Sequence, residues 1–320
     1  MKDSFAARGF CAFQSLLSAS QLQLLRRQCD DRRMAISLEC LCEADCVLEA
    51  LPEENYPPEA HAARSNSAAY LELRASEEAD RKCLDTLLFS TLAAAANALL
   101  GGAPPRLFNE HFVSKPALGG PFRWHTDAAH QLEALFSLAA PERCDEHEYL
   151  SLWVALDDIQ DENGPLLLLP LDAPQPPQTP WYQVADEATE AWLESHTAHL
   201  VTTSGLRAGD AVAFSSRVWH RSQPNTGHSD RRVFYAQYSR TVLGMAEDSP
   251  LALAIPTYPD ASASTRATGR AIFFLPQLVS APCMSSREAE AVGQVQLDRL
   301  HGPYSCSFTA RCGSLAAGPV

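Results

Sequence analysis

The most informative part of the chain reads Phe122-Arg-Trp-His125-Thr-Asp127. On an extended segment, a histidine and a carboxylate two positions apart point to the same side, because strand side chains alternate between the two faces. His125 and Asp127 can then bind one metal ion. The pair alone is a weak signal, since a chain with 10 histidines can contain it by chance. Its meaning depends on a further ligand elsewhere in the chain.

A third ligand follows 95 residues after His125, within Arg217-Val-Trp-His220-Arg. Two histidines and one carboxylate on one face of a metal form the facial triad of non-haem Fe(II) oxygenases. Such a triad leaves coordination positions open for a cosubstrate and O₂. His125, Asp127 and His220 have the residue types that this triad requires.

Two adjacent arginines begin 11 residues after His220. An oxygenase of this type needs an electron donor, which 2-oxoglutarate supplies through oxidative decarboxylation. The distal carboxylate of 2-oxoglutarate is best held by a bidentate guanidinium. The turn-rich residues 223–230 can bring the next strand back beside the metal. Because alternate residues of a strand share a face, either Arg231 or Arg232 faces the metal, but not both.

The composition excludes several classes of protein. With 46% apolar and 20% charged residues, the chain can bury a core and is neither disordered nor fibrous. Its net charge of −14 disfavours binding to nucleic acids and to anionic membranes. No apolar run approaches the about 20 residues of a membrane span, and the N-terminus does not resemble a secretory signal. We therefore expect a cytoplasmic protein in which Cys40, Cys42 and Cys46 are reduced thiols.

The order of predicted elements indicates an α+β fold around one β-core. A strand is expected at residues 9–13 and helices at 18–28 and 77–100, the first with Ser18 or Ser20 as its N-cap. The proline-containing segments 49–67 and 172–181 are predicted loops, and two further helices are expected at 186–196 and 285–300. Short segments bounded by turn residues predict antiparallel strands at 106–115, 149–158, 165–169, 211–214 and 231–239.

Several matches in the same order make the chain resemble the phytanoyl-CoA dioxygenase family of Fe(II)/2-oxoglutarate oxygenases. The resemblance runs from about residue 9 to about residue 256. The matching segments are Arg8-Gly-Phe10 with residues 16–21, Lys115-Pro, Trp124-His-Thr-Asp127, Ser151-Leu-Trp-Val-Ala-Leu-Asp-Asp158, Glu162-Asn-Gly-Pro165, Ala208-Gly-Asp210, the spacing from His220 to Arg231, and Gln237-Tyr-Ser239.

The resemblance implies a double-stranded β-helix (jelly-roll) core with helices packed on one side. We expect one domain over residues 1–320, with a helical part at about 1–105, the jelly roll at about 106–245 and a C-terminal extension at about 246–320. The family's substrate loop differs here, because Pro170 is followed by Leu-Asp-Ala rather than Gly-Ser-His. The implied roles are iron binding by His125, Asp127 and His220, binding of 2-oxoglutarate by Arg231 and Ser222, and lining of the cosubstrate site by Lys115 and Trp153.

The expected function is hydroxylation of a small organic substrate with Fe(II), 2-oxoglutarate and O₂, releasing succinate and CO₂. Retention of Asp127 argues against a halogenase, which needs that ligand position vacant for chloride. Desaturation or epoxidation at the same site, hydroxylation of a protein side chain, and a catalytically silent binding or regulatory protein remain open. The complete triad with Arg231 argues against the silent protein. The sequence indicates neither the prime substrate nor the oligomeric state.

Other histidines and arginines receive weaker interpretations. His111, His130, His147 and His228 have no partner at ligand spacing and are expected on the surface. A local excess of positive charge suggests either a solvated face or steering of an anionic substrate. It comprises Arg217, Arg221, Arg232 and Arg240.

Overall fold

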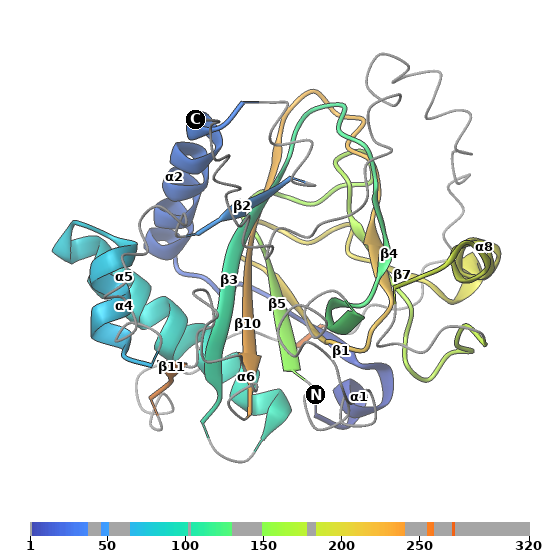
Figure 1. Ribbon diagram of the computed structural model, residues 1–320, viewed down its shortest axis with the longest axis horizontal. Helices are drawn as coiled ribbons and strands as arrows, with labels where there is room; N and C mark the ends of the chain where they lie inside the picture. The colour runs from blue at the N-terminus through green and yellow to red at the C-terminus, as the bar shows by residue number, and fades with distance from the viewer. Residues whose placement is uncertain are drawn as a thin grey trace, which may run out of the picture.

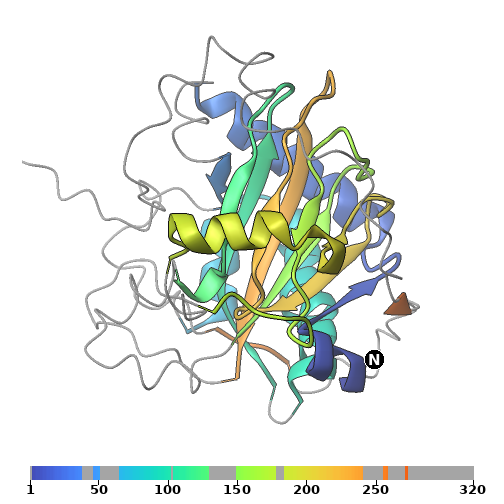
Figure 2. The ribbon, with the colours of Figure 1, turned by 90° about the vertical axis from the view of Figure 1, so that its right-hand side faces the viewer.

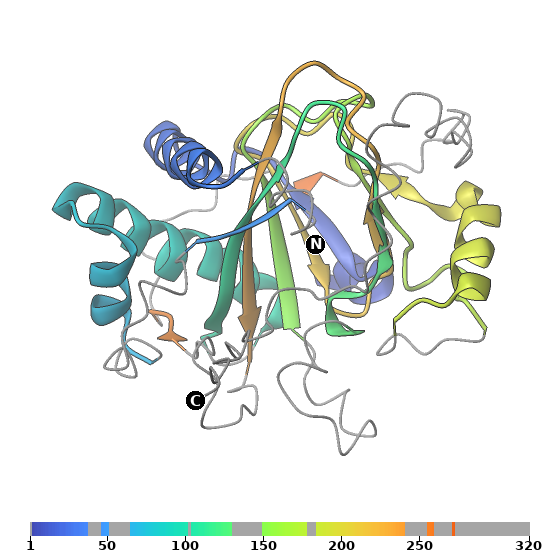
Figure 3. The same cartoon turned by 45° about the horizontal axis from the view of Figure 1, so that its top comes forward.

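The computed structural model describes residues 2–37, 46–50, 65–101, 104–129, 149–177, 184–240, 255–258 and 271–272. Two antiparallel sheets lie face to face (Figure 3). The larger follows the order β11-β3-β10-β5-β8-β1-β12, and β2 also pairs with β3. Its strands are β1 (Phe10–Phe13), β2 (Val47–Glu49), β3 (Arg106–Lys115), β5 (Tyr149–Ala155), β8 (Ala211–Ser215), β10 (Arg231–Ser239), β11 (Ile255–Pro256) and β12 (Ala271–Ile272).

The smaller sheet follows the order β4-β9-β6-β7. Apolar side chains from both sheets pack together between them, including Trp153 and Tyr235 of the large sheet and Leu168 of the small one. We call the face of the large sheet that turns toward this core its inner face. The strands of the small sheet are β4 (Phe122–His125), β6 (Leu166–Leu168), β7 (Val201–Thr202) and β9 (His220–Ser222).

Helices cover the other face of the large sheet (Figure 1). Leu152 of β5 and Phe234 of β10 are buried there among leucines of the helices, because each strand alternates between the two cores. The helices before β3 are α1 (Lys2–Arg8), α2 (Ala19–Ala35), α4 (Ser67–Arg74), α5 (Glu78–Thr86), a π-helical segment (Leu87–Thr91) and α6 (Leu92–Leu100).

One helical stretch among the described residues, Glu78–Leu100, is long and apolar enough to cross a membrane by length and composition. Its mean hydropathy reaches 1.5, and 61% of the residues in that window are buried inside the protein. The leucines of this stretch contact the large sheet and the neighbouring helices. The stretch therefore forms the centre of the helical layer.

The predicted fold class, an α+β jelly roll with helices packed on one side, is confirmed. The two sheets do not close into a barrel. Each of the five predicted strands after residue 105 is present, and Ser18 caps α2 in a capping box with Gln21. The predicted helix at 186–196 is α8 (Glu187–Ser195), which Asp186 caps, and a short 3₁₀ turn, Thr197–His199, follows it.

The segment 49–67, predicted as a loop, differs at both ends. Glu49 belongs to β2, and Ser67 begins α4, which Asn66 caps. Both elements are short, so neither leaves a clear periodic pattern. The predicted helix at 285–300, Cys40 and Cys42 lie outside the described residues.

Candidate functional site

His125, Asp127 and His220 meet between the two sheets, with one donor atom of each within 4.8 Å of the others. The Nε2 atoms of His125 and His220 lie 3.8 and 3.6 Å from Oδ1 of Asp127. These separations exceed a hydrogen bond between nitrogen and oxygen. The three donor atoms therefore surround a common point, as ligands of one ion do.

Strand pairing, rather than alternation along one strand, brings the three residues together. β4 and β9 pair so that His125 lies opposite His220, and their rings are 4.1 Å apart between centroids. His125 is the last residue of β4, whereas Asp127 begins a helical turn. The prediction that both side chains stand on one extended segment was therefore wrong for Asp127. After His125 the chain leaves the small sheet, and the helical turn presents the Asp127 carboxylate to side chains of the large sheet.

Backbone carbonyls fix the orientation of both histidine rings. Nδ1 of His125 lies 2.8 Å from the carbonyl oxygen of Arg123, and Nδ1 of His220 lies 2.9 Å from that of Val218. With the proton on Nδ1, Nε2 keeps its lone pair for a metal. Metal-binding histidines commonly use such a bond to set ring tautomer and direction.

Three side chains of the inner face support Asp127. Ser151 and Tyr235 donate their hydroxyl protons to Oδ2, Tyr235 at 2.5 Å, and the Gln237 amide donates at 3.2 Å. Burial raises the pKa of Tyr235, so its hydroxyl stays protonated and can donate. These bonds occupy Oδ2 and leave Oδ1 toward the histidines. No single role was predicted for these three residues, although two of them share the face of β10 that carries Arg231.

His111 packs against Tyr235, contrary to the expectation that it lies on the surface. Its ring stacks on that of Tyr235, with centroids 4.7 Å apart and an interplanar angle of 14°. Burial lowers the pKa of His111 to about 4, although Asp127 opposes the shift. The ring is therefore neutral near pH 7. His228 is exposed as expected, whereas His130 and His147 lie outside the described residues.

Arg231 is the arginine that faces the inner core. It is fully buried, and its guanidinium carbon lies 5.3 Å from the centre of the Trp153 ring. None of its three guanidinium nitrogens has a hydrogen-bond partner in the described part of the chain. Burial lowers the pKa of Arg231 to about 10, so the side chain is still charged at neutral pH. A buried cation of this kind calls for an anionic ligand.

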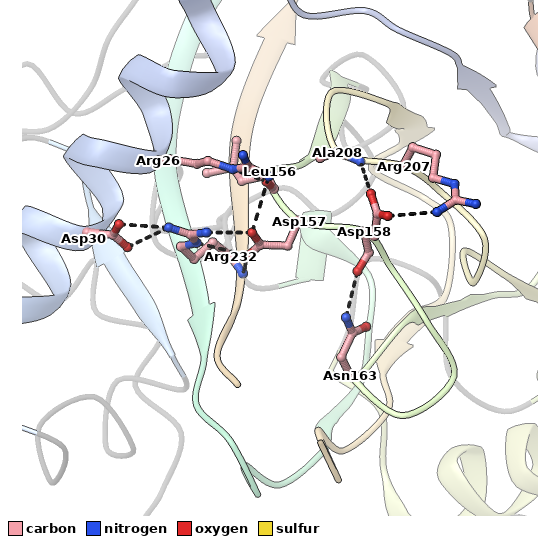
Figure 4. A network of polar contacts seen from close by, with 9 residues as sticks. All are labelled: Arg26, Asp30, Leu156, Asp157, Asp158, Asn163, Arg207, Ala208 and Arg232. Atoms are coloured by element: carbon pink, nitrogen blue, oxygen red, sulfur yellow. Dashed lines mark hydrogen bonds and ion pairs between the residues drawn. The ribbon is translucent and has the colours of Figure 1, made fainter. Parts of the chain in front are cut away.

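Arg232 projects to the opposite face, as alternation along β10 requires. It binds Asp157 at 2.7 Å and Asp30 of α2 at 2.8 Å, so it ties the helical layer to the sheet (Figure 4). Asp158 beside it accepts from the Ala208 backbone and from Arg207. The acidic pair that ends the 151–158 motif therefore has a structural role.

Lys115 lies beside Arg231 on the large sheet, whereas Ser222 belongs to the small sheet. Lys115 is opposite Arg231 in the pairing of β3 with β10, and its Nζ donates to the Gly120 carbonyl at 2.6 Å. Gly164 has a φ of +83°, and a Cβ there would lie 2.9 Å from Cδ of Lys115, so the loop needs a glycine at this position. Ser222 is buried on β9 but makes no hydrogen bond to Arg231.

The arginine-rich group does not form a free cationic surface. Arg221 forms an ion pair with Glu194 of α8, which also accepts a hydrogen bond from the indole of Trp124 at 2.8 Å. The guanidinium of Arg240 donates to the carbonyl of Leu100. Figure 2 shows α8 lying across the outside of the small sheet. These contacts are structural and do not support steering of an anionic substrate.

The comparisons with known proteins agree with this geometry. The family model described as phytanoyl-CoA dioxygenase (PhyH) matches residues 5–233. L-proline trans-4-hydroxylase from Streptomyces griseoviridis is 28% identical over 194 residues, or 54% of this chain and 69% of that enzyme. The crystal structure of AviO1 from Streptomyces viridochromogenes Tue57 has a TM-score of 0.50 at 19% identity, covering 76% of this chain and 95% of that one. That last likeness bears on the fold alone.

The family match spans most of the two sheets and their helical layer, and it includes the triad and Arg231. The resemblance found in the sequence is thereby confirmed. The chain belongs to the phytanoyl-CoA dioxygenase family and is a dioxygenase that depends on Fe(II) and 2-oxoglutarate.

Proposed function

We propose that this protein hydroxylates a small organic molecule, with Fe(II) held by His125, Asp127 and His220 and with 2-oxoglutarate held by Arg231. The observation that carries the proposal is the buried guanidinium of Arg231, which has no hydrogen-bond partner among the described residues and lies on the sheet face that also supports the triad. Burying a charge without a partner raises the free energy of the folded protein by several kcal/mol, on the order of the desolvation penalty of one ion. An anionic cosubstrate relieves that cost.

The residues fit both groups. Two imidazoles and a carboxylate form the donor set of a facial triad, and each imidazole has its Nδ1 fixed on a carbonyl. Planar guanidinium matches a carboxylate in bidentate fashion, and Trp153 supports it from one side. When bound, Fe(II) supplies the oxidative chemistry, in which 2-oxoglutarate and O₂ become succinate and CO₂ and the substrate gains a hydroxyl group.

The remaining proposed roles follow from position. Lys115 and Trp153 line the cosubstrate side, and Ser222 contributes a hydroxyl from the small sheet. Oδ2 of Asp127 is held by Ser151, Tyr235 and Gln237, so that its Oδ1 stays aimed at the metal. Apolar side chains between the sheets exclude water from the reacting groups.

The relative that hydroxylates L-proline makes a small amino acid the first substrate to test. Desaturation, epoxidation and hydroxylation of a protein side chain use the same residues and are distinguished by the product. The described cysteines form no disulfide, and Cys11 and Cys29 are buried thiols. This redox state supports a location in the cytoplasm.

The test is formation of succinate from 2-oxoglutarate by iron-loaded protein after O₂ is admitted. We expect succinate from the wild type, and a loss of at least about 100-fold in His220→Ala, the scale of other lost catalytic contacts. His228→Ala is the matched control, because His228 is exposed and has no proposed role at the site. Absence of succinate together with absence of iron-dependent 2-oxoglutarate binding would leave a catalytically silent protein as the better account.

A further inference from the structure

Glu49 is a carboxylate on the inner face that the proposed chemistry does not use. β2 pairs with β3 so that Glu49 lies opposite His111, and β3 pairs with β10 so that His111 lies opposite Tyr235. Directly opposite residues of antiparallel strands project from the same face. Tyr235 donates to Asp127, so this is the face that supports the triad.

The preceding residue of β2 confirms the direction. Leu48 lies opposite Phe112 and is buried with it in the core beneath the helices. Because strand side chains alternate, Glu49 projects to the other side. Neighbouring strands are about 4.8 Å apart, which places the β2 backbone roughly 10 Å from that of β10. Glu49, His111 and Tyr235 therefore form one row across the inner face, and Tyr235 at the end of this row donates to Asp127.

The carboxylate of Glu49 has no counter-charge among the described residues. In the part of the chain that the structure describes, no hydrogen bond or ion pair reaches it. Burial raises the pKa of Glu49 to about 7, and the negative charge of Glu110 adds to the rise. His111 beside it is neutral, because burial lowers its pKa to about 4. The buried cation Arg74 is already bound to Glu110, at 2.9 Å.

We propose that Glu49 binds a positively charged nitrogen of the substrate, and that the prime substrate is a small molecule bearing a primary or secondary ammonium group. The inference rests on the proposed function. It assigns the anionic cosubstrate to the buried Arg231 and the cationic substrate to the half-buried Glu49. A net charge of −14 also favours the approach of cations.

The first experiment compares matched pairs of probes that differ in charge. L-proline is paired with tetrahydrofuran-2-carboxylic acid, pyrrolidine with tetrahydrofuran, and butylamine with butanol, at neutral pH. The readout is succinate formed beyond the substrate-free rate. Each pair differs at one group, which is an ammonium in the cationic probe and an ether or hydroxyl oxygen in its neutral twin. We expect the cationic probes to stimulate succinate release at least about tenfold more than their twins, since a charge-assisted bond is worth that much or more.

Variants of Glu49 then test whether this residue causes the preference for ammonium groups. Glu49→Gln keeps the side-chain size but removes the charge, so KM for the cationic probes should rise about 10- to 100-fold, more than kcat falls. Glu49→Asp should recover part of the preference. Glu72→Gln, at an exposed carboxylate of α4, is the matched control and should behave as the wild type. Thermal unfolding of each variant separates a loss of binding from a loss of fold.

Each other outcome has a defined meaning. Equal stimulation by charged and neutral probes, no stimulation by any cationic probe, or an unchanged KM in Glu49→Gln contradicts the inference while the substrate-free succinate still supports the dioxygenase. Absence of both basal succinate and iron-dependent 2-oxoglutarate binding in the wild type contradicts the proposed function itself.

Discussion

At the scale of single residues, the site holds charges that the folded chain does not neutralise by itself. Arg231 is buried against Trp153 without a hydrogen-bond partner among the described residues, whereas its neighbour Arg232 binds two aspartates. The two adjacent arginines thus have different roles, one in the proposed function and one in the stability of the fold. One holds a charge ready for a ligand, and the other joins α2 to the sheet.

Replacing Arg231 with methionine should therefore stabilise the ligand-free protein while removing 2-oxoglutarate binding. We expect the free energy of unfolding to rise by about 1–3 kcal/mol, because an uncompensated buried charge disappears. Affinity for 2-oxoglutarate should fall by at least about tenfold. Urea unfolding and 2-oxoglutarate titration measure the two effects. Arg232→Met is the control and should show the reverse pattern, with lower stability and near-normal affinity.

His111 should make the metal-free protein less stable in acid. Its pKa is about 4 when folded, below the ordinary value of 6.5, so the unfolded chain takes up a proton first as the pH falls. Stability from the neutral ring is complete above about pH 6.5 and is lost as the pH falls toward about 4, by up to about 3 kcal/mol. Urea unfolding at several pH values should show this slope in the wild type and a smaller one in His111→Gln. The exposed His228→Gln should keep the wild-type slope.

At the scale of elements, α8 braces the strands that carry His125 and His220. Glu194 binds Trp124, the residue before His125, and Arg221, the residue after His220. The Arg221 guanidinium also lies 5.3 Å from the centre of the Trp124 ring. One carboxylate therefore links β4 and β9 from the side opposite the metal site.

Glu194→Ala should loosen this brace. We expect a loss of about 1–3 kcal/mol in the free energy of unfolding, since a buried donor and a cation lose their common acceptor. Affinity for Mn²⁺, measured by electron paramagnetic resonance, should fall less than in His220→Ala. Glu187→Ala, at an exposed position on the same helix, should change stability by no more than about 0.5 kcal/mol. An unaltered Mn²⁺ affinity in Glu194→Ala would restrict the brace to a structural role.

The elements differ in how well the sequence predicts them. β3 and β10 are long and alternate clearly, so their limits of 106–115 and 231–239 match the prediction. β2 spans three residues and is recognisable only by its pairing with β3. His125 and His220 were predictable from spacing, whereas the roles of Ser151 and His111 depend on which strands become neighbours. The helical turn at Asp127 likewise leaves no periodic pattern.

At the scale of the whole molecule, ligands should stabilise the fold by mass action. Mn²⁺ and 2-oxoglutarate, each at about 100 times its Kd, should add about 2.7 kcal/mol apiece. For a chain of this size each kcal/mol raises Tm by roughly 2–4 °C. In calorimetry, Mn²⁺ should no longer raise the Tm of His220→Ala, and 2-oxoglutarate should no longer raise the Tm of Arg231→Met. Equal shifts in both variants and the wild type would show that the ligands bind elsewhere.

The pairing of His125 with His220 has a consequence for the unfolded chain. The two residues are neighbours across β4 and β9, yet 95 residues separate them, and this interval contains β5, β6, α8, β7 and β8. An ion bound by both closes that interval into a ring, as a disulfide does. For a ring of about 100 residues, the entropy removed from the unfolded chain corresponds to about 4–5 kcal/mol. A metal at the proposed site would act as a reversible cross-link, and strands that never touch it would become harder to separate while it is bound.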